Sequence, residues 1–451
     1  MELHVYVILC TWSAQHPALP PKTNLKVSKM LRIWFAFWRK FKWMLFAIFA
    51  PESMAAKAIG DFVAAYVSSK CSNMAHHARL SETTWTRHHA FYANMGGYIL
   101  EGPVGGHVKV AEASSTEEET TVQQNKPLAP SDHRRKHRWM EKEEWEDLDA
   151  FYEKLFQDPD EQHLLDFDFP FAVNSAQICI LLDKGVVTRL PHLAPHEITE
   201  MGKEDIVIKL IALFQVLWLI IEVVARSIKG LQTTQLEIAA LAFAACTIFT
   251  YLFLFEKPKD AIQRTYLQAT RELTSTEKRQ ICLRHSELCF QDLIFFSIPG
   301  EWRRPATTIR NDVYNIESHL FCIGNSIRIH AEDVGLGLGG MIVGAVHCIA
   351  WNFPFPTYVE MLLWRICSLV SVGLTPAMYI SWFCSRWFED NVQEGMLGKL
   401  GALFKAVYFP AFYLLYVLSR LALLVLVFRS LVYSPSDAFT ATWAASLPHI
   451  A

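Results

Sequence analysis

Long apolar runs separated by charged segments dominate the pattern along this chain of 451 residues. Two runs, 206–225 and 238–255, each approach the roughly 20 apolar residues that a helix needs to cross a bilayer. Between them, Gly230 suits the end of a helix, and Thr234 and Glu237 have the spacing of a capping box. Because both runs are apolar on every face, we expect a transmembrane hairpin in preference to a buried hairpin of a soluble protein.

Three further apolar runs follow, at 334–351, 361–383 and 402–428. The first two predict a second transmembrane hairpin, and the third is long enough to span a bilayer with some tilt. The pattern as a whole predicts an all-α, polytopic membrane protein with about five transmembrane helices, located in a membrane that the sequence does not specify.

Basic residues between the runs predict the orientation. The loop 352–360 has no Lys or Arg, whereas basic residues follow the second and fourth runs. By the positive-inside tendency, we expect 352–360 outside the cytosol and the segments before 206, at 256–333 and at 384–401 inside it. Two basic residues in the loop of the first hairpin are the exception.

The N-terminal pattern is different. Residues 32–50 combine aromatic side chains at helical spacing with four basic residues. This composition is typical of a helix that lies in the membrane interface, or of one whose second half enters the bilayer. An amphipathic helix packed on a soluble core is the alternative, and it fits the many large aromatics less well. Residues 112–132 have few large apolar side chains and predict a disordered linker.

The predicted organisation has nine segments. They are an N-terminal membrane-associated region (1–106), a disordered linker with a basic patch (107–138), a cytosolic amphipathic segment (139–205), a transmembrane hairpin (206–255), a charged and partly helical cytosolic loop (256–333), a second transmembrane hairpin (334–383), a short cytosolic loop (384–401), a transmembrane helix (402–428) and a C-terminal tail (429–451).

The composition limits the classes of partner that the protein is expected to bind. Hydrophobic residues make up 52% of the chain and charged residues 19%, and the net charge is −3. This charge creates no field that would recruit nucleic acid, so we expect no nucleic-acid partner. The expected partner is the lipid bilayer, with protein partners bound through the cytosolic segments. The ten cysteines are scattered and do not indicate a secreted disulfide scaffold.

Ionisable residues in or beside the apolar runs are the candidate functional residues, because a charge at membrane depth is costly. They are Glu222, His347, Glu360, Arg365 and Arg420. His347 lies near the middle of its run, where it could gate protons, ligate a cofactor or hydrogen-bond to a neighbouring helix. Glu360 and Arg365 flank the start of the fourth run and could pair with each other or anchor at the interface.

The segment that begins Gly335-x-Gly337-x-x-Gly340 satisfies the glycine pattern of a dinucleotide-binding loop. The charged residues before Gly335 do not form a buried strand, and the two prolines after the apolar run make a poor central strand. We therefore interpret Gly340 and Gly344 as a face of small residues for helix packing.

Two sets of Cys and His residues give only weak evidence of a metal-binding site. Cys282, His285 and Cys289 share one face of a predicted helix, but no second ligand pair follows at a suitable spacing. The pairs His76–His77 and His88–His89 do not supply the ligands that a di-iron site needs. The sequence therefore predicts no metal, no cofactor and no catalytic residue.

Five stretches carry a resemblance to a known family: 9–21, 39–58, 89–97, 230–260 and 344–368. In this order they are similar to those of a large fungal family of multi-pass membrane proteins whose function is not established. The resemblance covers about half the chain and includes no catalytic motif. It implies the same membrane class and a fungal source.

These observations favour a membrane scaffold or regulatory protein. The alternative is a transporter or channel with a polar path near His347 and Arg420, although no internal repeat supports it. A membrane-embedded enzyme ranks third, because the chain has no recognisable pairing of nucleophile and base.

Overall fold

The computed structural model describes most of the chain. The described residues are 18–19, 29–103, 165–201, 206–231, 233–259, 261, 263–285, 305–309, 319–323, 327–391 and 396–433. The predicted linker 107–138, residues 139–164 and 202–205 of the amphipathic segment that follows it, and residues 434–451 lie outside this part of the chain.

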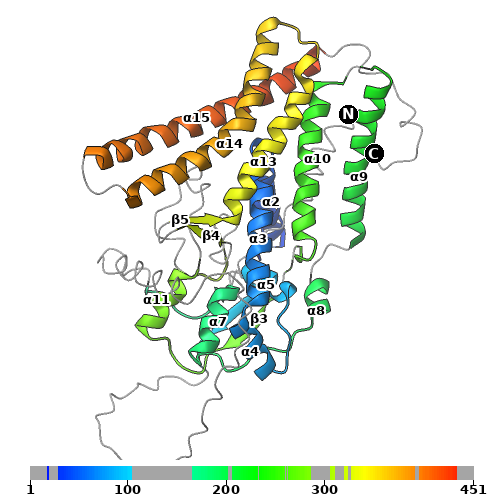
Figure 1. The fold of residues 1–451 in the computed structure, drawn as a ribbon. Coiled ribbons are helices and arrows are strands. Elements are labelled where there is room, and N and C mark those ends of the chain that lie inside the picture. Colours follow the sequence, from blue (N-terminus) through cyan, green and yellow to red (C-terminus); the bar gives the residue numbers. More distant parts are fainter. Residues whose placement is uncertain are drawn as a thin grey trace, which may run out of the picture.

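A bundle of long helices stands above a small unit of short helices and strands (Figure 1). The long helices are α2 (Lys29–Phe49), α3 (Glu52–Lys70), α9 (Ile206–Ile228), α10 (Gln235–Leu254), α13 (Ala331–Cys348), α14 (Tyr358–Asn391) and α15 (Met396–Val432). The small unit, which we call the α/β unit, contains α4 (Ser72–Leu80), α5 (Arg87–Asn94), β1 (Tyr98–Glu101), β2 (Phe171–Val173), α7 (Ser175–Asp183), α8 (Pro195–Glu200), β3 (Thr265–Gln268) and α11 (Ser275–Leu283).

The strands of the α/β unit come from three distant parts of the sequence. β1 is central, antiparallel to β2 and parallel to β3. A second, two-stranded sheet pairs β4 (His319–Ile323) with β5 (Ile327–His330). The chain is mostly helical, but the all-α prediction is corrected by these strands. Each strand has only three to five residues, too few for an alternating pattern to be recognised in the sequence.

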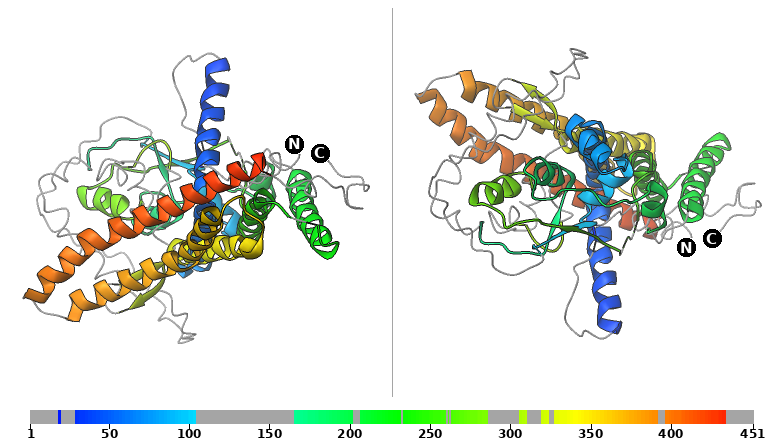
Figure 2. Two further views of the ribbon diagram at one scale, coloured as in Figure 1. Left: turned by 90° about the horizontal axis from the view of Figure 1, so that it is seen from above. Right: turned by 90° about the horizontal axis from the view of Figure 1, so that it is seen from below.

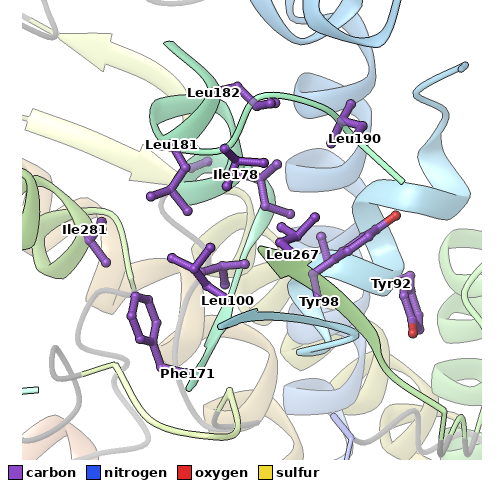
Figure 3. Packing of buried hydrophobic residues seen from close by; sticks show 14 of the residues in the cluster. Tyr92, Tyr98, Leu100, Phe171, Ile178, Leu181, Leu182, Leu190, Leu267 and Ile281 are labelled. Carbon is purple, nitrogen blue, oxygen red and sulfur yellow. The ribbon is translucent and has the colours of Figure 1, made fainter. Parts of the chain in front are cut away.

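Apolar side chains from all three strands and from the surrounding helices form the core of the α/β unit (Figure 3). Leu100 of β1, Phe171 of β2 and Leu267 of β3 are each no more than 2% exposed. Ile178 of α7 and Ile281 of α11 close the cluster over the sheet. The strands alone would be too short to be stable, so this core holds them together.

The shared sheet constrains the α9–α10 hairpin. β2 precedes α9 in the chain and β3 follows α10, yet both strands pair with β1. The hairpin therefore leaves the α/β unit and returns to it on the same side. A helical hairpin joined by a short loop satisfies this requirement, and the Thr234–Glu237 capping box begins its second helix as predicted.

Three helices of the described chain are long and apolar enough to cross a membrane, fewer than the five predicted. They are Gln235–Leu254, Ala331–Asn352 and Leu414–Val432, of which the second joins α13 to the 3-10 helix η4 (Ile349–Asn352). The other two predicted spans lie within α9 and α14, which are helical.

Helix α14 continues to Asn391 and α15 begins at Met396. Helices therefore occupy most of the segment 384–401, which the sequence pattern predicts to be a loop. The polar residues there ended the apolar run but not the helix, because helix propensity does not require apolar side chains.

Close packing around α13 organises the bundle. A Cβ atom added at Gly335 would lie 2.7 Å from Ala56 Cα, and one at Gly339 would lie 2.8 Å from Glu52 Cβ. One at Gly344 would lie 2.5 Å from the backbone nitrogen of Val372 on α14. These glycines let the backbones of α3 and α14 approach α13 closely.

Helix α2 projects away from the rest of the protein (Figure 2). Its large aromatic side chains are well exposed, including Trp34 at 58% and Trp38 at 53%. Trp34 stacks on Trp38, and Phe37 stacks on Phe41, so the aromatic residues form a continuous row along the helix. An exposed apolar row of this kind marks a surface for another partner.

The glycine packing can be tested with two alanine substitutions. Gly344→Ala should destabilise the bundle by about 1–3 kcal/mol, because its methyl group meets the α14 backbone. Gly373→Ala on α14 is the matched control, because nothing lies within 4 Å of a Cβ atom there. Thermal unfolding in detergent would compare them. Equal melting temperatures for the two variants would contradict the close contact.

Candidate functional site

A buried ion pair lies at the centre of the bundle. Glu52, the first residue of α3, is 1% exposed, and its Oε2 atom lies 3.6 Å from Nη2 of Arg420 on α15. Nε of Arg420 donates a hydrogen bond of 3.2 Å to the carbonyl of Phe49, the last residue of α2. Arg420 therefore attaches the corner between α2 and α3 to α15.

Local sequence explains the position of Glu52. Pro51 precedes it, and proline favours the start of a helix because its missing N–H needs no partner there. A carboxylate in the first turn of a helix is also stabilised by the helix dipole. Gly339 of α13 leaves the space that the Glu52 side chain occupies. The sequence analysis missed Glu52, although an acid directly after Pro51 and before an alanine-rich stretch was a recognisable signal.

Two further polar groups lie near Arg420. Its charge acts on His347 of α13 and on Cys246 of α10. The charge of Arg420 on α15 therefore pairs with Glu52 of α3 and acts electrostatically on groups of α10 and α13. Arg420 and His347 are the two candidates that the structure brings together, and Glu52 and Cys246 complete the group.

His347 makes its hydrogen bond within its own helix. Its Nδ1 donates to the carbonyl of Val343 at 2.7 Å, one turn earlier. The indole N–H of Trp364 on α14 donates to the carbonyl of His347 at 3.0 Å, and the two rings lie 5.5 Å apart. His347 is thus 5% exposed, and it packs against Trp364 of α14.

The other candidates lie at separate helix contacts. Glu360 at the start of α14 pairs with Arg429 near the end of α15, with 2.7 Å between Oε1 and Nε. Arg365 donates to the carbonyl of Trp351 at 3.0 Å and lies over its indole ring. Glu222 is half-buried on α9.

The two packing glycines lie on α13. Gly344 contacts α14 through Ser371 and Val372, whereas Gly340 is buried. The dinucleotide pattern that begins at Gly335 therefore falls inside a continuous helix.

A second buried charge cluster lies where the bundle meets the α/β unit. Asp61 of α3 pairs with Lys257, just after α10, at 2.6 Å, and with Lys57 at 2.9 Å. Burial favours a raised pKa for Asp61, but the two lysines outweigh it and lower the pKa to about 2. Asp61 therefore stays ionised and ties α3 to the end of α10.

A cleft of about 440 Å³ lies beside this cluster. Its lining residues are Tyr66, Ser69, Lys70, Trp85, Thr86 and Arg87. Two cations and three hydroxyl groups are chemically suited to a small anion. Arg87, however, is already paired with Glu256 at 2.5 Å, which reduces the positive charge of the cleft.

The histidines of the α/β unit make structural contacts. His77 lies 2.7 Å from Asp183, and His89 lies 2.7 Å from the carbonyl of Leu193. His285 is buried against Gln177, and Cys289 lies outside the described residues. In the part of the chain that the structure describes, no group of three or more His, Cys, Asp or Glu residues is placed to hold a metal ion.

Because His285 is buried, its protonation state affects the stability of the α/β unit. Desolvation lowers its pKa to about 4, and the amide nitrogen of Gln177 lies 3.2 Å from Nδ1, where it donates to the neutral ring. The same nitrogen donates to the carbonyl of Ile281 at 2.8 Å. A protonated ring would place a second donor against this amide, so the folded unit favours neutral His285.

We expect the α/β unit to lose stability as the pH falls from about 6.5 towards 4, because only the unfolded state binds the His285 proton there. The loss should approach about 3 kcal/mol at the lower end. Amide exchange of β1, corrected for intrinsic rates, would measure it. His285→Gln should flatten the dependence, whereas His76→Gln, at an exposed histidine, should not. An unchanged slope in His285→Gln would reject this origin.

The Glu52–Arg420 pair can be tested by charge removal. Glu52→Gln leaves the Arg420 charge buried without its partner and should destabilise the bundle by about 3–5 kcal/mol. Glu52→Gln with Arg420→Gln should recover part of this loss. Glu360→Gln is the control, because half-exposed Arg429 can turn to water, and should cost about 1 kcal/mol or less. Thermal unfolding would measure the stability of each variant. Equal losses for Glu52→Gln and Glu360→Gln would contradict a buried Glu52–Arg420 pair.

Comparison with known proteins places the chain in a family. No curated protein and no solved structure matches it. One family, described as a family of unknown function (DUF8562), matches residues 4–125 and 130–283, which is more than half of the chain. The match includes α2, α3, the α/β unit and the α9–α10 hairpin, and it ends before α13. The chain therefore belongs to DUF8562, a family of unknown function.

Proposed function

We propose that this protein is a multi-pass membrane protein that acts as a membrane scaffold or regulatory protein. In this proposal, the helix bundle lies in the bilayer and holds the α/β unit at its cytosolic face. The observation that carries the proposal is that polar residues of the helix bundle form hydrogen bonds between helices. Arg365 and Arg420 each bind a backbone carbonyl of another helix, and the backbone carbonyl of His347 accepts a hydrogen bond from Trp364 of α14. Such contacts fix helices relative to one another, as a scaffold requires.

The proposed topology has five spans, α9, α10, α13, α14 and α15. Three of them have the length and apolarity of membrane helices in the described chain. The α9–α10 hairpin starts and ends at one sheet, which supports two crossings by that hairpin. The 256–333 segment and the region before 206 then lie on the same side, in agreement with the predicted cytosolic location of both. The fungal source remains a prediction.

Helix α2 supports membrane association at the edge of the protein. Its exposed row of aromatics accompanies Lys40 and Lys42 on a helix that projects from the bundle (Figure 2). This combination suits a helix that contacts acyl chains with its aromatic face and anionic headgroups with its lysines. We propose that the lipid bilayer covers this helix, and that protein partners bind the cytosolic segments.

A transporter or channel is the second candidate. It is favoured by one observation, the buried Glu52–Arg420 pair with His347 close by, because ionisable residues at membrane depth often mark ion paths. Against it, Arg420 and His347 are already bonded to carbonyls of α2 and α13. Opening a path would require these bonds to break. A membrane-embedded enzyme remains the third candidate.

Flux through reconstituted vesicles separates the first two candidates. We expect vesicles that contain the full chain to dissipate a proton or potassium gradient no faster than empty vesicles, because a scaffold opens no path. The double variant Glu52→Gln with Arg420→Gln is the control for the polar cluster. A flux that the unsubstituted chain supports and the folded double variant loses would replace the scaffold with a transporter.

The proposed orientation has its own test. Lys184 is exposed on the α/β unit, so Lys184→Cys offers a site for a membrane-impermeant maleimide. Label beyond that of the unsubstituted chain should appear in inside-out vesicles and in lysed cells, but not in intact cells. Labelling of Lys184→Cys in intact cells would place the α/β unit outside and reject its cytosolic role.

A further inference from the structure

Two cysteines from distant parts of the chain meet in the α/β unit. Cys71 caps the N-terminus of α4, and Cys179 lies in α7. Helices α4 and α7 are in contact, and the two thiols interact with each other. Both are free thiols at half-buried positions, and both pack against the edge of the core shown in Figure 3. Small reagents can therefore reach a thiol pair whose surroundings are ordered.

Hydrogen bonds between α4 and α7 hold the two sulfur atoms in place. Asp183, one turn after Cys179, accepts a hydrogen bond from the Asn73 amide at 3.3 Å and lies 2.7 Å from Nε2 of His77. The Cys179 thiol itself lies 3.9 Å from the Asp183 carboxylate. Asn73 and His77 thus clamp α7 against the first two turns of α4, directly beside Cys71.

The position of Cys71 favours its thiolate. The neighbouring Cys179 thiol is the largest cause of a lowered pKa of Cys71. Burial opposes this effect, but the backbone N–H groups of Met74 and Asn73 at the start of α4 also lower the pKa. Asp183 acts in the opposite direction, and the pKa of Cys71 falls to about 6. Thiolates at helix N-termini are the reactive form of cysteine.

Other cysteines of the described chain differ in this respect. Cys282 is completely buried in the core of the α/β unit, which makes a thiolate costly there, and Cys348 lies half-buried on α13. The reactive thiol is therefore expected at the α4–α7 contact.

We propose that Cys71 and Cys179 form a redox-active dithiol, which reacts with low-molecular-weight disulfides and closes a reversible disulfide between α4 and α7. The class of oxidant is a small dialkyl disulfide, such as a dimer of a cysteine-containing peptide. The site lies where α3 leaves the bundle and continues into α4. A bond there fastens the end of α3 to α7 covalently.

The reaction balances without another cofactor. The Cys71 thiolate attacks one sulfur of the small disulfide, its S–S bond breaks, and one small thiolate leaves. Cys179 then loses its proton and attacks the Cys71 sulfur of the mixed disulfide, which expels the second small thiolate. Two protein thiols are oxidised to one disulfide, the small disulfide is reduced to two thiols, and these take up the two protons.

Redox titration of the full chain in detergent tests the proposal. Incubation with mixtures of oxidised and reduced glutathione at pH 7, followed by alkylation and peptide mass spectrometry, should reveal a Cys71–Cys179 peptide that dithiothreitol removes. Cys179→Ser should instead trap glutathione on Cys71, because the second attack is lost. Cys348→Ser is the matched control and should leave the cross-linked peptide unchanged. Circular dichroism would verify that each variant folds.

Alkylation kinetics provide an independent measurement. At pH 7, Cys71 should react about tenfold faster than half-buried Cys348 with a small haloacetamide. The proposal is rejected if the folded chain forms no Cys71–Cys179 peptide at any glutathione ratio. It is also rejected if Cys71 alkylates no faster than Cys348, since the attacking thiolate would then be missing.

Discussion

The close approach of α13 to α3 is the contact on which the rest of the structure depends. Gly335 and Gly339 leave no side chain between α13 and the backbone of α3, so the two helices pack along their length. Helix α3 then continues as α4 into the α/β unit. One helix therefore belongs to both halves of the molecule. Anything that moves α13 in the bundle acts on α3, and through it on the short sheet below.

The same contact explains why charged groups are buried here. Glu52 lies beside Gly339, and the Glu332 side chain fills the space beside Gly60. A helix pair with glycines at its contact leaves room for carboxyl groups, and Arg420 supplies the opposite charge to Glu52. Buried ion pairs of this type contribute little net stability, because desolvation offsets their attraction. Their value lies in the geometry they select, since only one arrangement of α2, α3 and α15 brings the charges together.

Towards the α/β unit, close helix packing at glycines gives way to ion pairs and apolar contacts between larger side chains. Asp61 with its two lysines marks the boundary, where α3 passes the end of α10. Beyond it, an apolar core, two buried histidines and the Cys71–Cys179 pair lie within a few short elements. Helix α3 thus connects a bundle suited to a bilayer with a unit that carries the reactive groups. A membrane scaffold or regulator would use this division, with one half for anchoring and the other for response.

The sequence by itself determined the features that depend on local pattern. Apolar runs predicted helices at α9, α10, α13, α14 and α15, and the Thr234–Glu237 pair predicted the start of α10, because helix periodicity and capping act over a few residues. Only the tertiary structure decided the remainder. The sheet joins strands of three or four residues from distant segments, and Glu52 meets Arg420 across most of the chain. Likewise, Cys71 meets Cys179 where Asn73 and His77 bind Asp183. Such pairings depend on how helices pack, and no spacing within one segment of sequence encodes them.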